Sequence, residues 1–483
     1  MITDFIIVGG GTAGSVVASR LTEIKQFNVL LLEAGPATVP AATKTPALWQ
    51  QSHGGPLDWA PRTEPEPHLG QQTYHYPQGK GLGGSMNLFA GIYSRGDRSD
   101  YDQWREQNNP GWGWSYVEPY FEKPIREGLP ISTPSWVHPL TQEFLNHHQP
   151  QGATVWQRIG RQGQNVTSAD IYLGRARREN RSNLTILAQC QVVRVLLERD
   201  RAVGVEVLRE GRYETLRARS EIILAAGALH TPAILLRSGI GPSAHLESIG
   251  IPAKHHLPGV GENLQDHPRV GLNFTRPGHA ASPTLLDRLR YAVSHTGPFS
   301  TSGIEAGAYV FSRPGLVSPD LQLNLQIASS QSQNSPHSFT PHAFTPHAFT
   351  LWASLLRPMS RGYLRLRSAD PQDSPALHFH ALEEPSDRQT LAQGLEICRT
   401  WGAPLGSSLA DDNGQPRYGF HWHACGTTRM GEDPMAVVDS NLRVHGIRGL
   451  RIIDAGVMPT IPSGNTAFPT LMVAERGADL VRC

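Results

Sequence analysis

The chain has 483 residues, enough for about two or three ordinary domains with a large core. Its 43 Lys and Arg residues balance 42 Asp and Glu residues, so no net charge favours nucleic acid or an anionic membrane as a partner. The sequence has no apolar run as long as a membrane span, no secretory leader and no CxxC spacing among its four cysteines. We therefore expect a cytoplasmic protein with reduced thiols and no membrane span.

The first predicted elements form a strand–helix–strand unit around a glycine-rich turn. A strand over residues 4–8 leads into Gly9-Gly10-Gly11-Thr12-Ala13-Gly14, a helix follows from residue 15, and a second strand over 27–32 ends at Glu33. A glycine-rich turn between a strand and a helix, with an acid at this distance, is typical of a dinucleotide site. The pattern alone leaves NAD and FAD open as ligands.

Each conspicuous residue of this unit has a physical role in holding a dinucleotide. Gly9 permits the tight turn, Gly11 lets the backbone approach a pyrophosphate, and Gly14 lets the helix pack on the strand. The helix N-terminus directs free N–H groups at the phosphates. Glu33 can accept hydrogen bonds from a ribose 2′-OH, and its charge would repel a 2′-phosphate.

Apolar runs in the middle of the chain predict several further elements. Three of them are expected to form a small antiparallel meander of strands, over residues 184–187, 191–197 and 202–207. The later elements are a strand over 221–227, a helix over 232–237, a strand over 362–367 and a helix over 388–401.

One low-complexity segment repeats the unit Phe-Thr-Pro-His-Ala between Phe339 and Ala348. Its histidines, His342 and His347, suggest a metal site at first sight. A proline in each unit disfavours a regular helix that would present both rings together, so a duplicated loop is the preferred interpretation.

A second histidine pair lies near the C-terminus, in His421-Trp422-His423-Ala424-Cys425. Strand alternation would place His421, His423 and Cys425 on one face, where a metal site is conceivable. No fourth ligand is evident, so we expect no metal. Taken alone, His423 is either a structural or a catalytic histidine.

Three blocks in order along the chain together resemble the glucose–methanol–choline (GMC) oxidoreductase family. They comprise residues 79–85 with 93–104, residues 227–241 with 257–268, and residues 423–427, 450–455, 463–466 and 469–479. The resemblance spans essentially the whole chain. It implies an α/β (α+β) fold in which a Rossmann-like FAD-binding domain is interleaved with a substrate domain built on an antiparallel sheet flanked by helices. We expect residues 1–120, 180–272 and 421–483 in the FAD-binding domain, and residues 121–179 and 273–420 in the substrate-binding domain.

The resemblance also implies the chemistry and the residues that perform it. His423 matches the family's catalytic base, and Asn465 matches its hydrogen-bonding partner. A neutral imidazole can take the hydroxyl proton of an alcohol while hydride leaves carbon for the flavin, and an amide can hold the substrate oxygen. By position, the residues expected to contact FAD are Gly9, Gly11, Thr12, Ala13, Gly14, Glu33, Ala34, Leu82, Gly83, Ser85, Val192, Asp454, Ala455, Asn465 and Thr466. Asp454 has an ordinary helix cap as its alternative role.

The loop after Ser85 departs from the family pattern. Met86 and Phe89 stand where the family usually has a small residue and an asparagine, and Asn87 comes two positions early. Some members attach FAD through a histidine in this loop, but Leu88 stands at that position, so we expect non-covalent FAD.

The function expected from the resemblance is FAD-dependent oxidation of an alcohol to an aldehyde or ketone. The segments 355–362 and 421–422 resemble bacterial aryl-alcohol and hydroxymethylfurfural oxidases, which favours small primary, aromatic or furanic alcohols as substrates. The electron acceptor is left open between O2 and a quinone or another acceptor. A hydroxynitrile lyase, a fatty-acid photodecarboxylase or a non-catalytic flavoprotein on the same scaffold are the alternatives.

Overall fold

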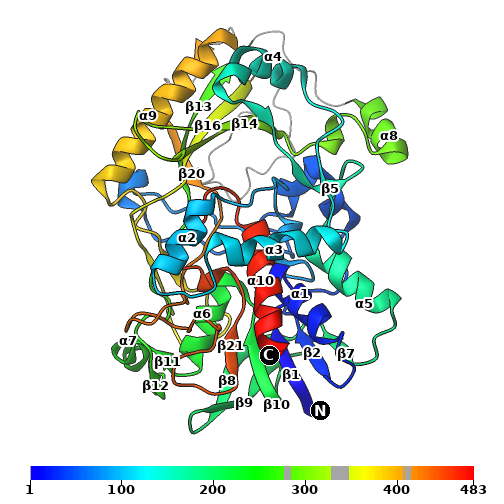
Figure 1. Cartoon of the computed structure of the whole chain (residues 1–483), viewed down its shortest axis with the longest axis vertical. Helices are drawn as coiled ribbons and strands as arrows, with labels where there is room; N and C mark the ends of the chain where they lie inside the picture. The colour runs from blue at the N-terminus through cyan, green and yellow to red at the C-terminus, as the bar shows by residue number, and fades with distance from the viewer. Residues whose placement is uncertain (1, 277–283, 328–347, 406–407, 410–414, 483) are drawn as a thin grey trace.

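The structure is a computed structural model, and it describes residues 2–276, 284–327, 348–405, 408–409 and 415–482. Two large sheets, one below the other in Figure 1, dominate these residues. The Phe-Thr-Pro-His-Ala repeat lies outside the described residues from 339 to 347. Among the described residues, no helix is both long and apolar enough to cross a membrane.

The lower sheet, called here the mixed sheet, contains the predicted glycine-rich unit. Strand β1 (Ile2–Val8), helix α1 (Thr12–Leu21) and strand β2 (Val29–Leu32) follow one another as expected. The strand order is β7-β2-β1-β10-β9-β8, and β21 also pairs with β10. The remaining strands are β7 (Leu184–Leu187), β8 (Gln191–Glu198), β9 (Arg201–Arg209), β10 (Arg212–Leu224) and β21 (Leu450–Ile452).

Strand β10 joins two kinds of pairing in one sheet. Its first residues pair with β9 in antiparallel fashion, and its last residues pair with β1 and β21 in parallel. The predicted meander is therefore wrong in one strand: it consists of β8, β9 and β10, whereas β7 pairs in parallel with β2. After β7 the N–H groups of Gln189 and Cys190 donate to the carbonyls of Gly35 and Glu33, which holds this segment beside the end of β2. An apolar run alone does not indicate which strand it pairs with.

The upper sheet, called here the antiparallel sheet, has the order β19-β13-β16-β15-β14-β4, with β20 also pairing β13. Its strands are β4 (Thr154–Val155), β13 (Pro268–Thr275), β14 (Ile304–Val310), β15 (Leu321–Gln326), β16 (Ala348–Leu355), β19 (Ser408–Leu409) and β20 (Arg417–Phe420). Helix α9 (Pro385–Gly402) packs on β13, β15 and β16. The predicted domain boundary at residues 272–273 falls inside β13, and the division into two domains stays a prediction.

The other helices and small strands cover and connect these sheets. The helices are α2 (Arg98–Glu106), α3 (Trp114–Arg126), α4 (Pro139–His148), α5 (Gly174–Arg178), α6 (Gly227–Arg237), α7 (Ser243–Ser248), α8 (Leu285–Ser294) and α10 (Ala467–Arg482). The small strands are β3 (Ile131–Ser132), β5 (Arg158–Arg161), β6 (Gln164–Asn165), β11 (Ile240–Gly241), β12 (His255–His256), β17 (Tyr363–Arg365) and β18 (Ala376–His378). Pro232 was expected to begin this helix but lies inside it, and α6 begins five residues earlier, at Gly227.

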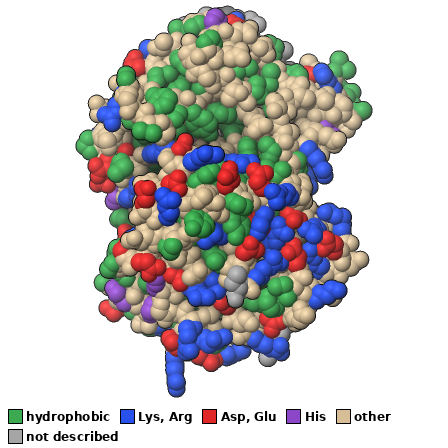
Figure 2. All heavy atoms as spheres, viewed as in Figure 1, with side chains coloured by type: hydrophobic (Ala, Val, Ile, Leu, Met, Phe, Trp, Pro, Cys, Tyr) green, Lys and Arg blue, Asp and Glu red, His purple; other side chains and the backbone are tan. Residues whose placement is uncertain are grey.

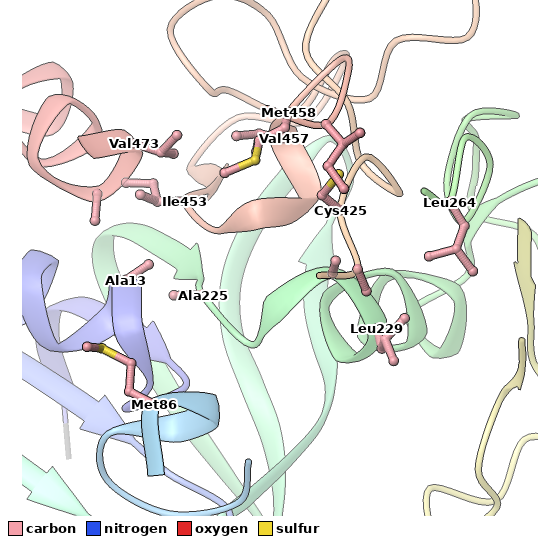
Figure 3. Packing of buried hydrophobic residues seen from close by; sticks show 14 of the residues in the cluster. Ala13, Met86, Ala225, Leu229, Leu264, Cys425, Ile453, Val457, Met458 and Val473 are labelled. Atoms are coloured by element: carbon pink, nitrogen blue, oxygen red, sulfur yellow. The ribbon is translucent and has the colours of Figure 1, made fainter. Parts of the chain in front are cut away.

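The two ends of the chain meet on the mixed sheet. Helix α10 packs along α1, and both termini lie in the lower half of Figure 1. The guanidinium of Arg20 donates to both carboxylate oxygens of the fully buried Glu475, at 2.8 and 2.9 Å. Figure 2 shows Lys, Arg, Asp and Glu side chains gathered over this part of the surface. The core beneath combines N-terminal, middle and C-terminal residues, as Ala13, Ala225 and Val473 illustrate in Figure 3.

Candidate active site

A long pocket extends from the glycine-rich turn of the mixed sheet to the strands of the antiparallel sheet. Most residues predicted to contact FAD line it: Gly9, Gly11, Thr12, Ala13, Glu33, Ala34, Ser85, Val192, Asp454, Ala455, Asn465 and Thr466, together with His423. Gly14, Leu82 and Gly83 are not among the described residues that line it. The structure therefore gathers in one cavity residues that are up to about 450 positions apart in the sequence.

The glycine turn has the shape that a phosphate group requires. The φ of Gly9 is +101°, a backbone conformation that favours glycine. A Cβ on Gly14 would lie only 1.8 Å from the carbonyl oxygen of Gly9, so α1 can approach the strand only without a side chain there. Gly11 caps α1 without a side-chain hydrogen bond, which leaves the first N–H groups of the helix open toward the pocket. These features fit the pyrophosphate of a dinucleotide.

Glu33 accepts several hydrogen bonds from the protein itself, which the sequence does not indicate. Its carboxylate accepts hydrogen bonds from the N–H groups of Gly10 at 2.8 Å, Gly35 at 2.8 Å and Gly81 at 2.9 Å. The carboxylate thereby ties the glycine turn to the loop that follows residue 79. A carboxylate has about four acceptor sites, so one remains for a ribose hydroxyl. Ribose binding by Glu33 stays a prediction.

Leu82 and Gly83 pack behind the pocket wall instead of lining it. The N–H of Gly83 donates to the carbonyl of Gly10 at 2.9 Å. A Cβ on Gly10 would lie 2.5 Å from Leu82 Cδ2, so the leucine covers the back of the glycine turn. Asn87 donates to the carbonyls of Leu82 and Gly84 and holds this loop closed. Leu88 and Phe89 do line the pocket.

The histidine segment at the other end is not the regular strand that was expected. Strand β20 ends at Phe420, and Trp422 has a φ of +63°, so alternation stops before His423. His421 is hydrogen-bonded to the hydroxyl of Ser354 on β16 through Nε2. Cys425 is fully buried and its N–H donates to the carbonyl of Gln265. His421, His423 and Cys425 therefore do not share one strand face, which corrects the geometry considered for a metal site.

His423 lies between two polar partners. Its Nε2 is 3.2 Å from Asn465 Nδ2, and its Nδ1 is 2.9 Å from Nδ1 of the buried His267. An amide nitrogen can only donate, so this arrangement makes Nε2 of His423 the acceptor, and the proton on Nδ1 is then donated to His267. This tautomer is assigned from the hydrogen-bond network. It leaves the basic nitrogen of His423 at the pocket, beside Asn465.

A buried carboxylate fixes the backbone on which His423 stands. Asp266 accepts from the N–H groups of His267, Trp422 and His423, at 2.6, 2.9 and 2.9 Å, and from the hydroxyl of Tyr76 at 2.7 Å. Asp266, His267 and His423 are the one group among the described residues whose donor atoms lie close enough together for a metal ion. The Asp266 carboxylate accepts from backbone N–H groups and Tyr76, and the two imidazoles hydrogen-bond to each other through Nδ1, so these contacts account for their closeness.

Burial controls the protonation of this cluster. It lowers the pKa of His423 well below its ordinary 6.5, and the nearby His267 and Arg269 lower that pKa further. Burial likewise lowers the pKa of His267 to about 3. His423 is therefore neutral at physiological pH, which is the state that can accept a proton.

The loop that carries Asn465 is held by residues of the block at 93–104. Asp100 on α2 accepts from the N–H and the hydroxyl of Ser463, at 2.7 and 3.0 Å. The indole N–H of Trp104 donates to the carbonyl and the hydroxyl of Thr460. Asn465 Oδ1 is buried and has no hydrogen-bond partner among the described residues. An unsatisfied acceptor beside the basic nitrogen of His423 fits a hydroxyl group of a ligand.

Asp454 lines the pocket and also serves as a helix cap, and its contact with FAD stays a prediction. It caps the short helix at Ala455–Val457 by accepting from the N–H of Gly456 at 2.8 Å. Its second oxygen accepts from the N–H of Gly227 and from the hydroxyl of Thr231 at the start of α6. Asp454 thus links the C-terminal segment to the second motif of the chain.

Sequence reasoning missed the residues at the far end of the pocket. These are Trp49, Arg269, Ile304, Asn324 and Trp352, which line the cavity near His421, Trp422 and His423. Most of them belong to strands of the antiparallel sheet, where each is a single inward-facing residue without a local motif. His267 was visible only as part of a longer block, with nothing to indicate its contact with His423.

Comparison with known proteins identifies the family. Models of the GMC oxidoreductase family match residues 3–146 and 133–269 in their N-terminal part and residues 358–474 in their C-terminal part. A glucose dehydrogenase [FAD, quinone] of Drosophila pseudoobscura pseudoobscura is 33% identical over 547 residues, covering 99% of this chain and 86% of that protein. The mitochondrial choline dehydrogenase of Mus musculus is 33% identical over 540 residues, covering 99% of this chain and 89% of that protein.

A solved structure agrees with these matches. The crystal structure of pyridoxine 4-oxidase from "Mesorbium loti" superposes with a TM-score of 0.87 at 30% identity, covering 99% of this chain and 98% of that one. The chain belongs to the GMC oxidoreductase family. This confirms the predicted family, the α/β fold class, the assignment as an oxidoreductase and FAD as the cofactor.

Proposed function

We propose that this GMC oxidoreductase oxidises a primary alcohol on an aromatic ring to the aldehyde, with His423 as the base. The contact between His423 Nε2 and Asn465 Nδ2 carries the proposal, because a neutral proton acceptor and an amide donor meet there at the pocket. The flavin of FAD, when bound, supplies the hydride acceptor.

The protein's own residues supply the rest of the chemistry. Nε2 of His423 takes the hydroxyl proton, and Asn465 holds the alcohol oxygen in hydrogen-bonding distance of that nitrogen. His267 holds the imidazole of His423 in the tautomer that leaves Nε2 unprotonated. Trp49, Phe89, Trp352 and Trp422 line the pocket near His423, which favours an aromatic substrate and restricts water.

The opposite end of the pocket, at the glycine turn, is the proposed binding site for the cofactor. We propose that Gly9, Gly11, Thr12 and Ala13 hold the pyrophosphate, with Glu33 at the ribose. Leu88 stands where a covalent attachment would need a histidine, so FAD is held without a covalent bond. The electron acceptor is O2 or a quinone; one relative is named as a quinone-linked glucose dehydrogenase.

Anaerobic mixing of the yellow protein with a panel of alcohols tests the proposal. We expect benzyl-type primary alcohols to bleach the flavin absorbance, and O2 or a quinone dye to restore it. The acceptor that restores the colour distinguishes an oxidase from a dehydrogenase. A flavin that stays oxidised in the dark with every alcohol would contradict the proposal and favour a lyase or a photodecarboxylase.

The variant His423→Gln tests the catalytic assignment. Loss of the base should lower the rate of flavin reduction by about 10²–10⁴-fold while FAD remains bound. His255→Gln is the matched control, because Nε2 of His255 donates to the carbonyl of His445 outside the pocket. Full turnover by His423→Gln would show that another group takes the proton.

A further inference from the structure

We propose that Arg269 binds a carboxylate carried by the alcohol, so that the substrate is an aromatic alcohol with an acidic group. This rests on the proposed function, and it goes beyond that function by naming the charge of the substrate. The observation behind it is a buried guanidinium at the substrate end of the pocket without an anionic partner.

Strand pairing determines where Arg269 lies. It stands on β13, where its backbone is opposite Ser354 of β16 and Gly419 of β20. Its side chain is only 7% exposed, and it lines the pocket with Asn324, Trp352 and Trp422. Its charge contributes to the lowered pKa values of both His421 and His423, which places it close to the catalytic base.

Aromatic rings hold the guanidinium of Arg269 but do not neutralise it. Its central carbon is 4.1 Å from the ring centroid of Trp352 and 5.4 Å from that of Trp422. Within the described part of the chain, no carboxylate lies within 4 Å of it, and its Nε is buried without a partner. Burying an uncompensated cation costs several kcal/mol, so such a group is expected where a ligand completes the site.

The other two buried arginines have partners within the protein. Arg451 forms an ion pair with Glu221 at 2.6 Å, and Arg158 donates to the carbonyl of Ala90 and to Oδ1 of Asn165. The charge of Asp266 also acts on Arg269, but the oxygens of Asp266 already accept four hydrogen bonds. Burial lowers the pKa of Arg269 to about 10, which still leaves the group charged at neutral pH.

The pocket wall near Arg269 is also rich in donors. Asn324 on β15 accepts a hydrogen bond from the indole N–H of Trp156 through Oδ1, at 2.9 Å. That contact fixes the orientation of its amide, and the Nδ2 group is buried without a partner among the described residues. A guanidinium fork and an amide nitrogen complement the oxygens of a carboxylate.

The same geometry disfavours a cationic alcohol. The faces of two tryptophans are the groups that usually hold a quaternary ammonium, and here Arg269 occupies them. A choline-like substrate would meet a buried positive charge instead of an aromatic cage.

Two substrates of the same shape provide the test: 4-(hydroxymethyl)benzoate and 4-(hydroxymethyl)benzamide. The wild-type holoenzyme should have a kcat/KM at least about tenfold higher for the carboxylate, mainly through a lower KM. Choline should not reduce the flavin. Equal kcat/KM values for the two aromatic alcohols would overturn the inference while the proposed function stands.

Variants at position 269 separate charge from packing. Arg269→Met keeps an unbranched chain between the indoles, and it should lower kcat/KM for the carboxylate by about 10²-fold but change the value for the amide less than about threefold. Arg269→Lys should give an intermediate preference, because lysine has the charge without the fork. Arg194→Met is the control, since Arg194 pairs with Glu206 on the mixed sheet away from the pocket.

A binding measurement makes the inference independent of turnover. Calorimetric titration of the holoenzyme with benzoate should show binding to the wild type and to Arg194→Met, and at least about tenfold weaker binding to Arg269→Met. Equal affinity of Arg269→Met and wild type would refute the role of Arg269 in anion binding. If Arg269→Met does not retain FAD, the role of Arg269 is tested by the kcat/KM values of the wild type and of Arg269→Lys for the carboxylate and the amide substrate. If no alcohol bleaches the flavin, the proposed function fails and the benzoate titration still tests the anion site.

Discussion

At the scale of single residues, the site depends on burying histidines in a neutral state. His423 contacts Asn465 on one side and His267 on the other, and burial lowers the pKa values of both histidines. A protonated His423 could not accept the hydroxyl proton. The residues around His423 therefore widen the pH range in which it can act as a base.

The first prediction concerns the acid limb of the pH profile. Because the pKa of His423 is lowered, its protonation requires a pH below 6.5, and kcat/KM should stay constant from pH 7.5 down to at least 6.5 before it falls. Initial rates with a neutral benzyl alcohol between pH 4.5 and 9 measure this, with flavin absorbance at each pH as the control for integrity. A limb centred at or above pH 6.5 would contradict the assignment of His423 as a buried base.

Only part of this site could be predicted from the sequence. His423 and Asn465 belong to blocks that resemble the family, and the structure brings them into contact; their catalytic roles stay predictions. Arg269 and His267 could not be assigned roles, because a residue on a buried strand gains its function from neighbours on other strands. Leu82 and Gly83 were expected at the pocket and instead pack behind Gly10, because a motif does not show which side of a loop faces the ligand.

At the scale of elements, the joining of α1 and α10 is the most consequential contact. Arg20 of α1 and Glu475 of α10 form a bidentate pair, and the hydroxyl of Tyr172 also donates to Glu475. Glu475 is fully buried, so its charge has no water to stabilise it if Arg20 is lost or displaced. The pair also positions the glycine turn at the start of α1 relative to the segment that carries Asn465.

The variant Glu475→Gln tests this contact. Removal of one charge leaves Arg20 partly buried without its main partner, and the free energy of unfolding should fall by about 3 kcal/mol. Thermal and denaturant unfolding of the FAD-loaded protein measure the change. Glu198→Gln removes one partner of the exposed pair with Arg217 and should leave the unfolding midpoint almost unchanged. Similar changes in the free energy of unfolding for both variants would show that the buried Arg20–Glu475 pair contributes no more to stability than an exposed pair.

The helices and strands also show which sequence patterns are sufficient to predict an element and its neighbours. The glycine-rich unit was predicted because its strand, turn and helix are adjacent in the chain. The predicted partner of β7 is wrong, because the sequence of an apolar strand does not indicate which strand pairs with it. Strand β20 ended earlier than alternation indicated, because Asp266 accepts from the N–H groups of Trp422 and His423 and bends the chain there.

At the scale of the whole molecule, one pocket spans both sheets and both ends of the chain. A ligand that fills it touches the glycine turn, the α6 start, the antiparallel sheet and the C-terminal loops. Such a ligand stabilises only the folded chain, so FAD binding and folding are coupled.

The prediction at this scale is that FAD is released intact on denaturation. After precipitation with trichloroacetic acid, the yellow colour should remain in the supernatant, because Leu88 offers no attachment atom. Adding FAD at about 100 times its Kd should stabilise the apoprotein by about 2.7 kcal/mol, seen as a higher Tm. A yellow protein pellet would show covalent attachment through another residue.

The pairing of β10 with β1, and of β21 with β10, has a consequence for how the protein is made. Strand β1 is synthesised about 200 residues before β10 and about 450 residues before β21. At about 5–20 residues per second, the N-terminal unit waits tens of seconds for its partners. The mixed sheet is therefore incomplete until β21 has been synthesised, and chaperones can bind the unpaired edges of β1 during that interval.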